Sequence, residues 1–374
     1  MPAGTGGARA RIAGHLPVCE SPKEPTMTSI RRPQPWDAPS GRPILPEALW
    51  PSRREIVRAI GLGGAMLAAG PLASCQEGVQ SGVEDSPVTT YPASDRWTPK
   101  WHVVGGKDAY PAKRNGAYRV RRSLNPEDDA ATRNNFYEFL PGRAGPVHLN
   151  VDGFVPEPWK ITIAGEVEEE RVVDLDDIAK VAGLEERVYH FRCVERWSMV
   201  VPWTGIPLAR FIEWCRPKST AKHVRFISFG PKDLDEEQRK HMPPGFQGAS
   251  NYPWPYYEGL RMDEATNELA FLATGIFGHG LPMQHGAPLR VIVPWKYGYK
   301  NPKSFVRVEF TREQPHTFWN DLQSTEYPYL SNIDPEKPHP RWSQATEWDI
   351  TTKDWMPTLK YNGYGEYVAG LYGG

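Results

Sequence analysis

Short segments in which apolar and polar residues alternate recur between residues 159 and 311 of this 374-residue chain. Such alternation is typical of half-buried β-strands. The predicted strands are Trp159–Ala164, Val188–Val194, Lys222–Phe229, Pro288–Pro294 and Lys303–Thr311. The chain also contains 38 prolines and 14 tryptophans, a combination that favours a loop-rich α+β or mostly β architecture over a helical bundle.

Three segments have helical patterns. Asp174–Lys180 begins with an Asp N-cap and an acidic first turn. Pro207–Cys215 places Leu208, Phe211, Ile212 and Cys215 at helical spacing, which predicts a buried position for Cys215. Met262–Ala273 is the third predicted helix, and ordered structure is expected to begin near Asn134. With these helices the predicted fold class is α+β, with mixed β-sheets, short helices and many loops.

The first 75 residues resemble an export leader. The paired arginines Arg53 and Arg54 precede an uncharged, Gly/Ala-rich stretch from Ala59 to Leu72, as in twin-arginine signals. A short core helix with a basic start is the alternative, but its glycines and Pro71 disfavour a helix interior. Leu72–Cys75 also resembles a lipoprotein processing box, in which Cys75 carries the lipid. We expect an exported protein with a leader over residues 1–75, an extended arm over 76–120 and one folded domain over 121–374.

The overall charge gives no sign of a polyanionic partner. The chain has 44 Lys and Arg residues against 45 Asp and Glu residues, so its net charge is close to zero. A basic surface that holds nucleic acid is therefore not indicated. No window contains the roughly 18 to 20 uncharged apolar residues that a membrane-spanning helix requires.

Cysteine usage points to one thiol. Cys19 and Cys75 lie in the leader, which leaves Cys193 and Cys215. A disulfide between these two is one interpretation of the pair. Cys193 otherwise ends a predicted strand, where we expect it to face a cleft and Arg192 to favour its thiolate.

Three chemical roles for that thiol compete. A nucleophile with His190 as base is disfavoured, since a residue three positions away on a strand points to the opposite face. A zinc site needs three or four clustered ligands, yet the sequence has no CxxC or HExxH motif. A single thiolate on a redox-active metal, whose other ligands belong to an organic cofactor, needs only one protein sulfur.

Four collinear motifs carry a resemblance to a known family. In chain order the motifs are Asn134–Glu138 (NNFYE), Arg192–Trp203 (RCVERWSMVVPW), Gly286–Gly298 and His339–Glu347 (HPRWSQATE). They resemble the catalytic subunits of periplasmic protein-methionine-sulfoxide reductases, which are molybdenum-molybdopterin enzymes of the sulfite-oxidase fold. The resemblance extends from about Tyr118 to Trp348 and implies a sulfite-oxidase-type molybdopterin-binding catalytic domain.

The resemblance also implies which residues hold the cofactor. Cys193 matches the thiolate that ligates molybdenum, with one molybdenum per chain. The positions that match cofactor contacts are Asn134, Tyr137, Glu138, Ser228, His285, Arg290, Asn301, Pro302 and Lys303. Ser228 stands where Thr is usual, and His285 stands where Asn is common. Arg290 and Lys303 suit a phosphate-bearing pterin, although ordinary surface charge explains either of them taken alone.

The implied reaction is oxygen-atom transfer from a sulfoxide to the metal, with methionine sulfoxide in oxidised envelope proteins as the substrate. Glu195 is a candidate catalytic residue near the metal, or else a solvated loop carboxylate. The alternative activity is that of a sulfite-oxidase-like or small-molecule S- or N-oxide reductase with the same cofactor. Val194–Trp197 replaces the Arg-rich run of sulfite oxidases and suits a neutral sulfoxide better than a dianion.

The resemblance finally implies partners and an assembly state. Electrons are expected from a haem-containing membrane subunit that is fed by the quinone pool. The chain extends only 63 residues beyond Thr311, too few for the dimerisation domain of sulfite oxidases, so a monomeric catalytic subunit is expected.

Overall fold

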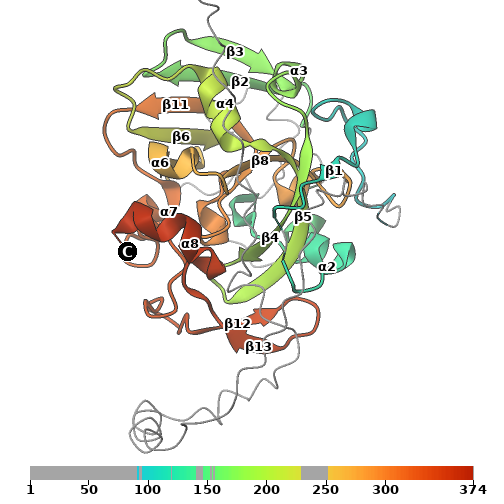
Figure 1. The fold of residues 1–374 in the computed structure, drawn as a ribbon, viewed down its shortest axis with the longest axis vertical. Helices are drawn as coiled ribbons and strands as arrows, with labels where there is room; N and C mark the ends of the chain where they lie inside the picture. The colour runs from blue at the N-terminus through green and yellow to red at the C-terminus, as the bar shows by residue number, and fades with distance from the viewer. Residues whose placement is uncertain are drawn as a thin grey trace, which may run out of the picture. The chain divides into compact units, whose positions relative to one another are not determined.

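The computed structural model describes residues 91, 95–118, 120–139, 146–151, 154, 156–228 and 252–373. The predicted leader, with Cys19 and Cys75, lies outside these residues. Two β-sheets dominate the described part of the chain (Figure 1). None of its helices combines the length and apolar character needed to span a bilayer.

The smaller sheet has five strands in the order β3-β2-β11-β6-β7. Its strands are β2 (Lys160–Gly165), β3 (Arg171–Asp174), β6 (His223–Ser228), β7 (Tyr257–Arg261) and β11 (Phe305–Thr311). β11 pairs in parallel with β2 and antiparallel with β6, so it lies in the middle of the sheet. Three of the predicted strands, at residues 159–164, 222–229 and 303–311, are confirmed in this sheet.

The larger sheet is built around β4 (Glu185–Arg192) and β5 (Trp197–Pro207), which form an antiparallel hairpin. Its other strands are β1 (Lys113–Arg114), β8 (Phe271–Ile276), β9 (His279–Gly280), β10 (Arg290–Ile292), β12 (Thr346–Asp349) and β13 (Trp355–Pro357). β12 joins the start of β5 in parallel, and β8 pairs with its end. Ten of the eleven β5 residues are buried, as expected for a strand covered on both faces.

The helices are short. They are α2 (Glu127–Thr132), α3 (Leu175–Ala179), α4 (Leu208–Cys215), α6 (Met262–Ala265), α7 (Phe318–Leu322) and α8 (Gly365–Val368). The predicted N-cap of α3 is confirmed, since the Asp174 side chain accepts a bond from the Asp177 backbone N–H in a capping box. α4 buries Leu208, Phe211, Ile212 and Cys215, as its spacing predicts.

Short 3-10 turns link these elements and shape the loops. They are η3 (Lys107–Ala109), η4 (Tyr137–Phe139), η5 (Val147–Leu149), η7 (Met283–His285), η8 (Gly298–Lys300), η9 (Lys360–Gly363) and η10 (Ala369–Tyr372). η4, η7 and η8 contain or adjoin predicted cofactor-binding positions. Buried apolar side chains from both sheets, such as Ile161, Val201 and Phe226, belong to one core cluster.

Two sequence predictions about the elements are wrong. The helix predicted over Met262–Ala273 ends at Ala265, and its second half enters β8. The run from Phe271 to Ile276 is buried between β5 and β10, and periodicity alone does not separate such a strand from a buried helix. Ordered structure also begins before Asn134, because β1 pairs with β4 and α2 precedes the Asn134–Glu138 motif. The domain boundary at residue 120 stays a prediction.

Candidate active site

Cys193 lies at the tip of the β4–β5 hairpin. Its backbone N–H donates to Trp197 O at 3.0 Å, and Arg196 N–H donates to Cys193 O at 3.1 Å. Arg196 has a φ of 75°, so the turn that positions the thiol includes a left-handed residue. The thiol is free, as is that of Cys215.

The thiol is buried beside a carboxylate. Cys193 is only 3% exposed, so the prediction that it faces an open cleft is wrong. Its Sγ lies 3.9 Å from Oε2 of Glu195. Burial raises the pKa of Cys193, and Glu195 raises it further, so the opposite effect of Arg192 does not prevail. A bound metal cation reverses this balance, because a coordinating thiol is deprotonated.

Two further side chains hold the Glu195 carboxylate. Its Oε2 accepts a 2.6 Å hydrogen bond from the Tyr137 hydroxyl and a 3.2 Å bond from Trp197 Nε1. Burial is the main cause that raises the pKa of Tyr137, with Cys193 and Glu195 adding to it, so the phenol stays a donor. The structure therefore brings the predicted residues Tyr137, Glu195 and Cys193 into one group.

Arg192 anchors the turn that carries the sulfur. Its buried guanidinium forms a 3.0 Å ion pair with Glu347 and donates to Gln344 Oε1 at 2.7 Å. Trp342 Nε1 and Gln344 Nε2 both donate to Val194 O, at 2.9 and 2.8 Å. The His339–Glu347 motif thus fixes the loop that carries the thiol.

A second group of predicted residues forms a buried, basic centre. Lys303 Nζ lies 3.2 Å from Glu138 Oε1 and 3.5 Å from Asn135 O. Arg290 and Lys303 face each other across an isolated β-bridge. Arg290 Nη1 donates to His285 O at 3.0 Å. Two cations against one carboxylate leave a net charge of +1 among Arg290, Lys303 and Glu138.

The residues of this centre and their sequence neighbours have buried polar atoms without a hydrogen-bond partner among the described residues. These atoms are Asn134 Oδ1, Asn135 Nδ2, Glu138 Oε2, Gln284 Nε2, His285 Nδ1, and Arg290 Nε and Nη2. Buried polar groups in folded proteins are nearly always bonded, so a concentration of unpaired ones indicates a missing polar ligand. The set offers cationic donors, amide donors and acceptors, and a neutral imidazole, since burial lowers the pKa of His285 to about 3. These groups fit an anionic, hydrogen-bonding pterin phosphate.

The remaining predicted residues support the loop that carries Lys303. Ser228 Oγ donates to Lys303 O. Asn301 Oδ1 accepts from Val293 N–H at 2.6 Å, and its Nδ2 donates to Tyr297 O at 3.2 Å. Pro302 O accepts from Val291 N–H at 2.8 Å. Direct contact of Ser228, Asn301 and Pro302 with a cofactor stays a prediction.

Sequence reasoning missed three parts of this centre. Asn135 and Gln284 stand next to predicted residues, but only the structure shows their amides buried and unpaired. The buried pair of Lys300 and Glu258, with Nζ 3.1 Å from Oε2, adds a second ion pair. Burial raises the pKa of Glu258 to about 7. In the sequence, only the two lysines of the Lys300–Lys303 turn indicated that further charged groups belong to this centre.

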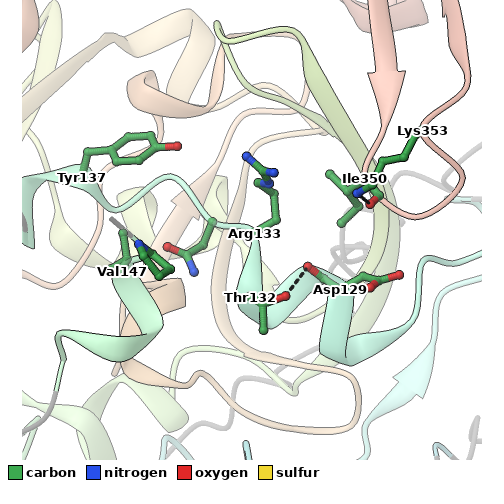
Figure 2. Close-up of a pocket in the computed structure, with 9 residues that line it drawn as sticks. Asp129, Thr132, Arg133, Tyr137, Val147, Ile350 and Lys353 are labelled. Carbon is green, nitrogen blue, oxygen red and sulfur yellow. Dashed lines mark hydrogen bonds between the residues drawn. The ribbon is translucent and has the colours of Figure 1, made fainter. Parts of the chain in front are cut away.

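An open pocket of about 360 Å³ adjoins the first group of residues (Figure 2). Tyr137 and Asn134 line the pocket, together with the end of α2, the η5 turn and the segment that follows β12. Cys193 is not among the lining residues. The pocket is therefore connected to the thiol through the Tyr137–Glu195 hydrogen bond.

Comparison with known proteins defines the class of this site. Residues 145–319 match the family described as Oxidoreductase molybdopterin binding domain. The sulfane dehydrogenase SoxCD from Paracoccus pantotrophus aligns over 52% of this chain and 50% of its own, with a TM-score of 0.36 and 15% identity, too weak a likeness to add to the assignment. The chain contains a molybdopterin-binding oxidoreductase domain with an α+β fold, as predicted.

Two relatives define the family more narrowly. Both are protein-methionine-sulfoxide reductase catalytic subunits MsrP, one from Burkholderia mallei and one from Ralstonia nicotianae. Each is 41% identical to this chain, over 335 and 342 residues respectively, which cover 88% of this chain and 92% of each relative. The chain therefore belongs to the family of protein-methionine-sulfoxide reductase catalytic subunits.

Proposed function

We propose that this chain is a molybdenum-dependent oxidoreductase that reduces methionine sulfoxide residues in proteins. Family membership supports the activity. The structural observation that carries it is the buried thiol of Cys193, which Lys303 influences electrostatically, together with the unpaired guanidinium nitrogens of the buried Arg290. When bound, molybdenum-molybdopterin supplies a two-electron centre for oxygen-atom transfer.

Different residues of the chain bind the metal, the phosphate and the pterin. Cys193 provides the protein ligand to the metal. Arg290 presents a guanidinium with two unused nitrogens, and Lys303 presents a point charge, which together suit a phosphate. Asn134, Asn135 and His285 offer unpaired amide and imidazole atoms to the polar edges of the pterin.

Glu195 and Tyr137 are placed to handle protons. Reduction of a sulfoxide consumes two electrons and two protons and yields a thioether and water. Glu195 is solvent-exposed, yet its carboxylate lies 3.9 Å from the Cys193 sulfur. Tyr137 orients the carboxylate through its 2.6 Å bond. We infer that Glu195 delivers protons from solvent to the reacting oxygen.

Substitution of the metal ligand tests the function. In Cys193→Ser we expect sulfoxide reduction to be abolished while circular dichroism and the melting temperature stay close to those of the wild type. Elemental and pterin analysis should find about one molybdenum per wild-type chain. Sulfite oxidation, measured in parallel, distinguishes the alternative activity. Retained turnover in Cys193→Ser would remove the proposed ligand role.

Location and electron supply form a separate part of the proposal. The relatives are named catalytic subunits, which supports a partner subunit. We propose a haem-containing membrane partner that draws on the quinone pool, and a periplasmic location reached through the twin-arginine motif. The prediction is that replacing Arg53 and Arg54 with lysine retains the protein in the cytoplasmic fraction. Unchanged periplasmic recovery would contradict this route.

A further inference from the structure

The pocket beside Tyr137 is lined by both apolar and cationic side chains. Pro146, Val147 and Ile350 supply apolar surface. Arg133 stands between Tyr137 and Ile350, as Figure 2 shows. Tyr137 connects this pocket to Glu195 and from there to the thiol, so a chain bound here lies next to the reaction centre.

Arg133 is a cation without an acidic partner. The described residues place no carboxylate or carbonyl in hydrogen-bond range of its guanidinium, which instead lies 5.2 Å from the centre of the Trp348 ring. Lys353 Nζ also lies 5.2 Å from the centre of that ring, and it donates to Ile350 O. Trp348 thus holds two cations at the pocket wall.

The charge balance of the pocket favours an anion. Arg133 and Lys353 contribute two positive charges, and Asp129 contributes one negative charge. The net charge of the lining side chains is therefore +1. Both cations are solvent-exposed, so they can exchange water for a carboxylate at little desolvation cost.

We propose that this pocket binds the polypeptide segment that flanks the methionine sulfoxide, and that Arg133 and Lys353 select segments with an Asp or Glu close to the oxidised residue. The inference rests on the proposed function and specifies its substrate class. Pro146, Val147 and Ile350 accommodate the aliphatic parts of the segment, while the two cations bind its carboxylate.

The pocket shares Asn134 with the residues assigned to the cofactor, but its two cations are not those of the basic centre. Arg290 and Lys303 are 1% and 0% exposed, and Nε and Nη2 of Arg290 have no hydrogen-bond partner among the described residues. Arg133 and Lys353 lie at the open surface and belong to other segments of the chain. A flexible protein segment reaches the open pocket more readily than the buried centre.

The test compares two unstructured peptides that differ only in charge. Each carries one methionine sulfoxide, flanked by Asp in one peptide and by Asn in the other, and a reduced viologen dye supplies electrons to the molybdenum-loaded enzyme. We expect the KM of the Asp peptide to be about fivefold lower in the wild type, the size expected of exposed ion pairs. In 0.5 M NaCl the two KM values should converge.

Substitutions test whether Arg133 and Lys353 cause the preference for the Asp peptide. In the double variant Arg133→Gln, Lys353→Gln we expect the two KM values to become equal, with molybdenum content unchanged. The matched control is Arg210→Gln, which removes an exposed arginine that lies on α4 outside the pocket and should keep the preference. Equal KM values in the wild type would overturn the inference. Loss of molybdenum from the double variant would also overturn it, because the pocket would then belong to the cofactor.

A small sulfoxide, dimethyl sulfoxide, separates this inference from the function itself. If the wild-type enzyme reduces the small sulfoxide but shows no charge preference, only the pocket assignment fails. If it reduces neither dimethyl sulfoxide nor either peptide, the proposed function fails and the pocket assignment falls with it.

Discussion

At the residue scale, the chemistry gathers on three neighbouring side chains. Tyr137 donates to Glu195, and Glu195 lies against Cys193. The sequence identified all three positions through the motifs, but it predicted an exposed thiol, whereas Cys193 is 3% exposed. The turn is held by bonds from Trp342 and Gln344 to Val194 O, and no local pattern specifies these long-range contacts.

The proton role of Glu195 gives a prediction at this scale. In Glu195→Gln the carboxylate is lost while the amide still accepts the Tyr137 bond. We expect turnover per molybdenum to fall about 100-fold, the usual size of a general acid or base contribution. The pH dependence of kcat should also flatten. Measurement of kcat across a pH series, normalised to molybdenum content, checks this prediction. Unchanged turnover would mean that Glu195 has only a structural role.

At the element scale, the site depends on how two hairpin-like loops are held. One is the β4–β5 turn with Cys193, and the other is the 286–303 segment with Arg290 and Lys303. β4, β10 and β11 at their bases were predicted as strands, whereas β5, which is buried along almost its whole length, was not. The contacts between the loops could not, since Gly298 packs against Phe191 and Asn135 from distant parts of the sequence.

Gly286 provides a test of the second loop. It has a φ of 96°, and a Cβ added there would lie 2.9 Å from Lys303 Cβ. Gly286→Ala should therefore destabilise the protein by about 1–3 kcal/mol, shift Lys303 and reduce molybdenum per chain.

Thermal melting and metal analysis of Gly286→Ala measure both effects. Gly183→Ala is the matched control, because a Cβ there meets no atom within 4 Å. Full metal content together with a wild-type melting temperature in Gly286→Ala would show that the loop tolerates the side chain.

At the scale of the whole molecule, buried titratable groups govern how stability varies with pH. Burial lowers the pKa of His190 to about 3, against 6.5 for an unperturbed histidine. Below pH 6.5 the unfolded chain therefore takes up a proton that the folded chain excludes, so this group makes stability fall as pH falls. Between pH 7 and pH 5 its contribution amounts to about 2 kcal/mol.

His190→Gln removes that contribution. Urea unfolding at pH 5 and pH 7 should show a smaller difference in unfolding free energy for the variant than for the wild type, by about 2 kcal/mol. An identical pH dependence in the two proteins would mean that His190 is protonated in the folded state. His190 is not among the predicted cofactor residues, so metal content is expected to stay unchanged.

The overall assignment followed from motifs more than from periodicity. Collinear motifs pointed to the family and to the cofactor, both supported by relatives 41% identical over most of the chain. Periodicity predicted five strands, which correspond to β2, β4, β6, β10 and β11, but it missed others such as β8, whose apolar run is buried between two neighbours. The Arg133 pocket escaped prediction because it unites α2, η5 and the segment after β12, which are adjacent only in the folded protein.

The ion pair between Arg192 and Glu347 joins residues 155 positions apart. A ribosome that has synthesised the β4–β5 hairpin must still add Gln344, Glu347 and β12 before these can hold the Cys193 turn in place. The turn therefore acquires these supports only after residue 347 has been synthesised. We therefore expect chains that are truncated before residue 344 to bind molybdenum-molybdopterin poorly.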